Sequence, residues 1–160
     1  MMQQFVDNKG MIMNHDDYMR LALNLAKEAA RDKETPVGSI IVNPDGIVIG
    51  KGRNRREKLS SAIAHAEIEA IENACKTLGD WRLLGCSLYV TLEPCPMCAG
   101  AMLMSRISKV YYGSREENTG SCGSVVNLFM EPFRHNTQIV GGILADESSA
   151  LLASFFKEMR

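Results

Sequence analysis

A chain of 160 residues with 46% hydrophobic and 23% charged residues can build one ordinary domain, and this composition is typical of a soluble globular protein. No stretch approaches the roughly 18 uninterrupted apolar residues that a membrane span needs, and we find no secretory signal, so we expect a cytoplasmic protein with no membrane partner. A net charge of −1 excludes a global basic field that would attract nucleic acid.

The first 40 residues predict a leader, a helix and a strand. Residues 1–13 have no apolar signal region, and we expect a disordered leader ahead of a single domain over residues 14–160. Apolar residues then recur at helical spacing and Asn14 is a possible N-cap, so residues 15–32 are predicted to form an amphipathic helix. Two apolar runs, 36–42 and 46–52, flank the sequence NPDG and indicate a β-hairpin.

The segment after the hairpin is locally basic. Residues 51–58 (KGRNRREK) carry five basic side chains and one glutamate, and taken alone this pattern favours a solvated loop. A second helix is predicted from about residue 65 to residue 77. The nearly all-apolar run 86–92 then predicts a strand in the interior of a sheet.

Strands and helices alternate in the second half of the chain. The predicted order is a helix with a proline in its first turn, a strand, a Gly-rich loop, a short helical turn, a last strand and a helix with an acidic start. These elements cover residues 96–105, 109–114, 115–124, 125–129, 138–144 and 146–159. The alternation predicts an α/β fold with a mixed sheet covered by helices on both faces.

Cysteine usage favours a metal or redox site. The chain has five cysteines, an odd number that argues against a disulfide scaffold. Cys95 and Cys98 are three residues apart at the predicted start of a helix, where helix N–H groups stabilise a thiolate. Cys75 and Cys86 are predicted to be packing residues.

A histidine and a glutamate stand at the start of the preceding helix. His65 and Glu67 are two residues apart, and side chains in a first turn can fan around the open helix end toward one site. If this end faces the cysteines, one nitrogen and two sulfurs meet, which is the ligand set of a catalytic zinc with an open fourth position. A carboxylate beside that position can take a proton from water and return it to a leaving group.

Each half of this pattern is weak alone. A His-x-Glu pair is common, and a Cys-x-x-Cys pair can be redox-active or merely buried. Together, His65-Ala66-Glu67 and Pro94-Cys95-Pro96-Met97-Cys98 match the H-x-E…P-C-x-x-C signature of zinc nucleobase deaminases.

Longer segments resemble the bacterial tRNA-specific adenosine deaminases over about residues 15–160. The most specific segments are the Gly-rich loop running into NLF and the ending GGILADESSALLASFFKEM. The resemblance implies a three-layer α/β/α cytidine-deaminase-like fold with a mixed five-stranded sheet, and a homodimer. It also implies zinc-dependent hydrolysis of adenosine to inosine at the wobble position of a tRNA anticodon loop.

The resemblance also implies roles for individual residues. His65, Cys95 and Cys98 would bind one Zn²⁺ per subunit, and Glu67 would be the catalytic proton shuttle. Further residues would bind the flipped base or contact RNA. The base-binding candidates are Asn54 and the backbone N–H of Ala66; the RNA candidates are Arg53, Arg55, Arg56, Lys58, Phe155, Phe156, Lys157 and Arg160.

The roles implied for Asn54 and for the pair Phe155 and Phe156 each have a simpler structural explanation. The amide of Asn54 offers a donor and an acceptor to a purine edge, but asparagine is also common in turns. Core packing is the simpler explanation for at least one of Phe155 and Phe156. Arg134 and Glu116 stand where relatives often carry Asn and Asp, so RNA contacts at these two positions are left open.

Two other functions remain as alternatives. A free-base or nucleotide deaminase of the guanine or cytosine type would share the zinc signature, and the basic stretch 51–58 and the C-terminal ending argue against it. A structural-zinc, RNA-binding module would have a closed four-ligand site. Glu67 argues against this second alternative, because a structural site does not require it.

Overall fold

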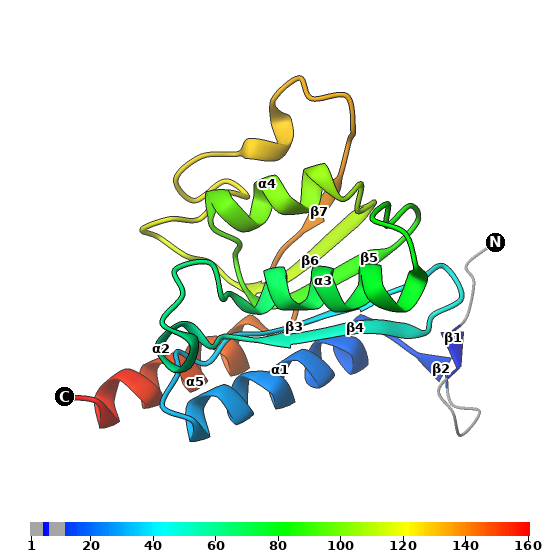
Figure 1. The fold of residues 1–160 in the computed structure, drawn as a ribbon. Helices are drawn as coiled ribbons and strands as arrows, with labels where there is room; N and C mark the ends of the chain where they lie inside the picture. Colours follow the sequence, from blue (N-terminus) through cyan, green and yellow to red (C-terminus); the bar gives the residue numbers. More distant parts are fainter. Residues whose placement is uncertain (1–4, 7–11) are drawn as a thin grey trace.

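A five-stranded mixed sheet lies between two layers of helices in the computed structural model, which describes residues 5–6 and 12–160 (Figure 1). The strand order is β4-β3-β5-β6-β7; β3 is antiparallel to both neighbours, and β5, β6 and β7 are parallel. The strands are β3 (Gly38–Val42), β4 (Val48–Arg53), β5 (Ser87–Leu92), β6 (Lys109–Ser114) and β7 (Gln138–Val140). The predicted α/β class with a mixed five-stranded sheet is confirmed.

The helices cover both faces of the sheet. Helices α3 and α4 lie on one face, and α1 and α5 lie on the other (Figure 1). Their bounds are α1 (His15–Arg31), α2 (Arg56–Leu59), α3 (Ala66–Leu78), α4 (Pro96–Met104), α5 (Ala145–Glu158) and the 3-10 turn η1 (Leu128–Met130). No helix in the described part of the chain has both the length and the apolar character to cross a membrane.

Alternation along the strands fills both layers of the core. In β3, Ile41 packs into the cluster under α3 and α4, whereas its neighbour Ile40 packs into the cluster under α1. Both side chains are fully buried. Successive strand side chains point to opposite faces, so the nearly all-apolar strands predicted from the sequence are those that have helices on both sides.

Most predicted elements match the structure within two residues, and three predictions need correction. Asn14 caps α1 through a reciprocal pair of 2.9 Å hydrogen bonds with Asp17, as predicted. The predicted strand 138–144 ends at Val140, because Gly142 adopts a left-handed φ of +89° that breaks the extended chain. The short helical turn lies at 128–130, later than predicted, and the predicted basic loop contains α2.

The predicted leader falls largely outside the described residues. Strands β1 (Phe5–Val6) and β2 (Ile12–Met13) pair antiparallel, and Met13 packs against the cluster under α1. Residues 1–4 and 7–11 are not among the described residues. A disordered leader over 1–13 and a single domain over 14–160 therefore stay predictions.

The N-terminal end of α3 is held close to the sheet. A Cβ on Gly52 of β4 would overlap the carbonyl oxygen of Ala66 in the first turn of α3. The backbone N–H of Arg53 also donates a 2.8 Å hydrogen bond to the Glu69 carboxylate. These contacts fix the helix end that carries His65 against the carboxyl end of β4.

Candidate metal centre and base pocket

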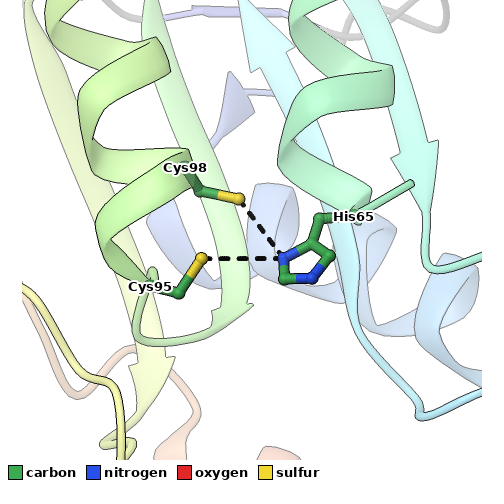
Figure 2. A group of neighbouring side chains, drawn as sticks. All are labelled: His65, Cys95 and Cys98. Carbon is green, nitrogen blue, oxygen red and sulfur yellow. Dashed lines mark hydrogen bonds between the residues drawn. The ribbon is translucent and has the colours of Figure 1, made fainter. Parts of the chain in front are cut away.

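Two helix N-termini bring one histidine and two cysteines together. His65 is the N-cap of α3 and Cys95 is the N-cap of α4, both with extended backbone, and Cys98 lies in the first turn of α4. Figure 2 shows the His65 ring facing the sulfur atoms of Cys95 and Cys98. The imidazole Nδ1 lies 3.7 Å from the Cys95 sulfur and 3.5 Å from the Cys98 sulfur. The structure thus assembles the three residues predicted as zinc ligands.

This donor set fits a tetrahedral zinc ion. One nitrogen and two sulfurs lie within 4.8 Å of one another, and all five cysteines are free thiols. Zinc bonds of about 2.05 Å to nitrogen and about 2.3 Å to sulfur, at tetrahedral angles, place such ligand atoms about 3.6 Å apart. The two nitrogen–sulfur separations are close to that value. Pro96, at the first position of α4, ends the preceding loop where the helix begins.

The pKa values of the Cys95 and Cys98 thiols are shifted in opposite directions. A hydrogen bond from the Cys98 thiol, together with the nearby His65, lowers the pKa of Cys95 to about 4. The same hydrogen bond and burial raise the pKa of Cys98. A metal is bound by thiolates, so an ion held by both sulfurs replaces the proton that they share.

Glu67 lies in the first turn of α3, next to this group. Its side chain is only 4% exposed, and burial raises the pKa of the carboxyl group to about 7. It does not belong to the group of three metal-ligating atoms. A buried carboxyl group with a near-neutral pKa can exchange protons readily at physiological pH.

A cavity of about 170 Å³ opens onto these residues. Its walls come from the end of β4, the starts of α3 and α4 and the loop after β6. The lining residues are Thr35, Val37, Asn54, Arg56, His65, Ala66, Glu67, Leu92, Glu93, Cys95, Glu116 and Thr119. Two of the three candidate ligands, His65 and Cys95, therefore share one pocket with the carboxyl group of Glu67 and the amide of Asn54.

Asn54 is both a turn residue and a pocket residue. Its side-chain oxygen accepts a 3.1 Å hydrogen bond from the backbone N–H of Arg56, and its amide nitrogen donates to the carbonyl of Thr35 at 3.4 Å. It is 7% exposed and lines the cavity. The turn role and the base-binding role predicted for it are thus compatible.

The structure separates the predicted RNA contacts into two kinds. Arg53 forms ion pairs with Glu28 at 2.9 Å and Asp32 at 3.1 Å, and Arg55 pairs with Glu69 at 3.1 Å. These pairs hold the two guanidinium groups against their own chain. The other candidates are exposed: Arg56 and Lys58 of α2, and Phe156, Lys157 and Arg160 at the chain end, where Phe155 is half-buried.

Some pocket residues have no signal in the sequence. Thr35 lines the cavity but belongs to no motif, Thr119 lies in the Gly-rich loop but has no predicted role, and Arg56 is predicted only as an RNA contact. Glu93 also escaped prediction, although its place two residues before Cys95 in TLEPC singles it out. Arg134 lines a different cavity, beside α4.

Comparisons with known proteins agree with this geometry. The sequence profile of the cytidine and deoxycytidylate deaminase zinc-binding region matches residues 12–114. A tRNA-specific adenosine deaminase of Bacillus subtilis (strain 168) is 45% identical over 150 residues, which cover 92% of each chain.

Two solved structures allow a comparison of folds. A structure from studies of A-to-I editing by tRNA:A34 deaminases has a TM-score of 0.81 at 42% identity, covering 84% of this chain and 98% of its own. A guanine deaminase from Bacillus subtilis has a TM-score of 0.63 at 32% identity, covering 89% and 94%. The present chain is therefore more similar in fold and sequence to the first of these two structures.

Proposed function

This chain belongs to the family of the cytidine and deoxycytidylate deaminase zinc-binding region and, within it, to the tRNA-specific adenosine deaminases, and on that premise we propose that it hydrolyses adenosine to inosine at the wobble position of a tRNA anticodon. The observation that carries the proposal is the group of His65, Cys95 and Cys98, of which His65 and Cys95 line a pocket together with Glu67 and Asn54. The pocket, about 170 Å³, is smaller than the roughly 300–1,000 Å³ of sites for drug-sized ligands. It therefore suits one base, with the rest of the RNA outside.

His65, Cys95 and Cys98 hold one zinc ion, which when bound makes hydroxide available near neutral pH. Glu67 takes one proton of the water that attacks C6 of the adenine and delivers it to N1, and it then takes the second proton from the oxygen now bonded to C6 and delivers it to the leaving amino group. Water and adenosine are consumed, and inosine and ammonia are formed. The carboxyl group of Glu67 ends the cycle in its starting state.

Two further groups of the pocket, the Asn54 amide and the Ala66 backbone N–H, hold the base. The amide of Asn54 hydrogen-bonds the purine edge, because it offers a donor and an acceptor together. The backbone N–H of Ala66 is one of the first-turn donors of α3 that have no partner within the helix, and it faces the same base. A base in an anticodon loop is already partly unstacked, so extruding it costs less than extruding a base from a duplex.

The RNA lies across the exposed basic residues near the pocket. Arg56 and Lys58 meet loop phosphates, and Arg56 also lines the pocket mouth. Phe156, Lys157 and Arg160 provide an aromatic face and two charges at the end of the C-terminal helix. For Arg53 and Arg55, contact with RNA stays a prediction. Action on tRNA also places the protein in the cytoplasm.

A decisive test of the reaction uses one short RNA. Purified, zinc-loaded protein is incubated with an anticodon stem-loop that carries adenosine at the wobble position, and inosine is detected by sequencing. We expect conversion of this stem-loop, whereas a matched stem-loop with its adenosine outside the anticodon and the free bases adenine, guanine and cytosine stay unchanged. Turnover of free guanine or cytosine without turnover of the stem-loop would instead identify a free-base deaminase.

The same proposal includes a homodimer formed through the surface beside α4. Three apolar side chains are strongly exposed there: Met104 at 68%, Met130 at 81% and Phe133 at 51%. Met104 and Phe133 border an apolar cavity of about 240 Å³, and a second copy of the chain would cover them. Sedimentation velocity should give a dimer for the parent and a monomer for Met104→Glu. A parent that sediments as a monomer at micromolar concentration contradicts the dimer.

A further inference from the structure

Glu93 is a buried carboxylate that the reaction does not use. It follows the end of β5, is 2% exposed and lines the base pocket. Its two oxygens accept hydrogen bonds from three backbone N–H groups. One oxygen accepts from Glu116 at 2.9 Å, and the other accepts from Cys122 and Ser124, both at 3.2 Å.

All three donors belong to one loop, residues 115–124, which contains no helix or strand. The loop contributes Glu116 and Thr119 to the wall of the pocket. These three backbone N–H groups donate to no backbone carbonyl of the described residues, and a carboxylate can accept several hydrogen bonds at once. Hydrogen bonds to the Glu93 side chain therefore hold this wall of the pocket, as backbone hydrogen bonds would in a helix or a sheet.

The loop also packs directly against the carboxylate. A Cβ on Gly120 would overlap a carboxylate oxygen of Glu93, so only glycine allows the loop to approach this closely. The backbone N–H of Ser121 donates a 2.9 Å hydrogen bond to the carbonyl of Pro94, the residue between Glu93 and Cys95. The loop is thus bonded to the Glu93 side chain and to the Pro94 carbonyl, the two residues that precede Cys95 and the start of α4.

We propose that Glu93 is a positioning residue that fixes the substrate-facing wall of the pocket, residues 115–124, relative to the metal ligand Cys95. Glu93 acts through the loop and not on the reacting atoms. This inference rests on the proposed function, because the wall matters for catalysis only if a base binds against it. Glu93 thus helps to place the bound base correctly, and it does not bind the metal.

Glu93→Gln tests the inference with little change of shape. An amide turns one acceptor oxygen into an NH₂ donor, so at least one loop N–H faces another donor. We expect the KM for the anticodon stem-loop to rise about tenfold, the energetic equivalent of one lost hydrogen bond to a charged group, with kcat reduced much less. Zinc stays at one per chain, and hydrogen exchange accelerates at the amides of Glu116, Cys122 and Ser124.

A second variant approaches the same contact from the loop. Gly120→Ala places a Cβ against both the Glu93 carboxylate and the carbonyl oxygen of Glu116, so it displaces the loop from the carboxylate, and we expect the same rise in KM with zinc retained. Because both changes weaken the same attachment of the loop to Glu93, the effects of the two variants should be less than additive in the double variant. Leu23→Ala, in the core under α1, is the control for general loss of stability, and its KM should match the parent value.

The outcomes separate the inference from the proposed function. If Glu93→Gln and Gly120→Ala lower only the melting temperature and keep the parent KM, the positioning role is wrong. It is also wrong if Glu93→Gln loses zinc while its loop amides stay protected. If the parent itself does not convert the stem-loop, the proposed function fails, whereas the exchange measurement still decides whether Glu93 holds the loop.

Discussion

Glu67→Ala should abolish nearly all turnover while the protein stays folded and loaded with zinc. The carboxylate is the only proton carrier assigned to the reaction, and positioned acid–base groups typically contribute about 10²–10⁴-fold to rate. We therefore expect kcat on the stem-loop to fall by about that factor. Thermal stability should change little or increase, because the variant removes a buried carboxyl group. Single-turnover kinetics and metal analysis measure the two effects separately.

The matched control for this variant lies on the same helix. Glu72 is an exposed glutamate of α3, outside the pocket, and Glu72→Ala should retain the parent rate. If Glu67→Ala stays within about threefold of the parent rate, a loss far below what acid–base groups contribute, Glu67 is not the proton shuttle. Loss of zinc from Glu67→Ala would also contradict the proton-shuttle role, because it would indicate that Glu67 is a metal ligand.

Cys95→Ala should lose zinc, activity and stability together. Even indirect partners of a metal site change metal affinity by about 10–100-fold, so the loss of a direct ligand should weaken zinc binding by more than about 100-fold. Metal binding also stabilises the fold that presents the ligands, and the melting temperature should fall. Elemental analysis after dialysis and thermal unfolding with and without a chelator measure both effects.

A second half-buried thiol provides the comparison for Cys95. Cys75 is free, half-buried and outside the group of metal ligands, so Cys75→Ala should keep zinc, turnover and the response of the parent to a chelator. A Cys95→Ala variant that retains one zinc per chain after dialysis against a chelator would show that the metal is held elsewhere. Equal destabilisation of both cysteine variants would reduce Cys95 to a packing residue.

The metal ligands were predictable because each has a local signal. Pro96 and the apolar spacing that follows mark one helix start, and His65 precedes another. That the two starts face each other is a tertiary fact, and the sequence supplies it only through the match to a known signature. The close approach of α3 at Gly52, which places His65, cannot be derived from spacing.

The parts missed by the sequence depend on partners that are distant in the chain. Helix α2 has four residues and no buried side chain, and its backbone N–H groups bond to the carboxylate of Glu34, more than 20 residues earlier. Glu93 accepts a hydrogen bond from the backbone N–H of Glu116, 23 residues later in the chain. The basic character of Arg53 was evident, but its acidic partners, Glu28 of α1 and Asp32 at the C-cap of that helix, were not. Local patterns carry no information about such pairs.

A crystal structure of the zinc-loaded protein, with the metal located by anomalous scattering at the zinc edge, would show directly which atoms bind the ion. We expect one ion bonded to the Nδ1 of His65 and to the sulfurs of Cys95 and Cys98, with solvent at the fourth position and Glu67 beside it. A fourth ligand supplied by the protein, or a disulfide between Cys95 and Cys98, would contradict it.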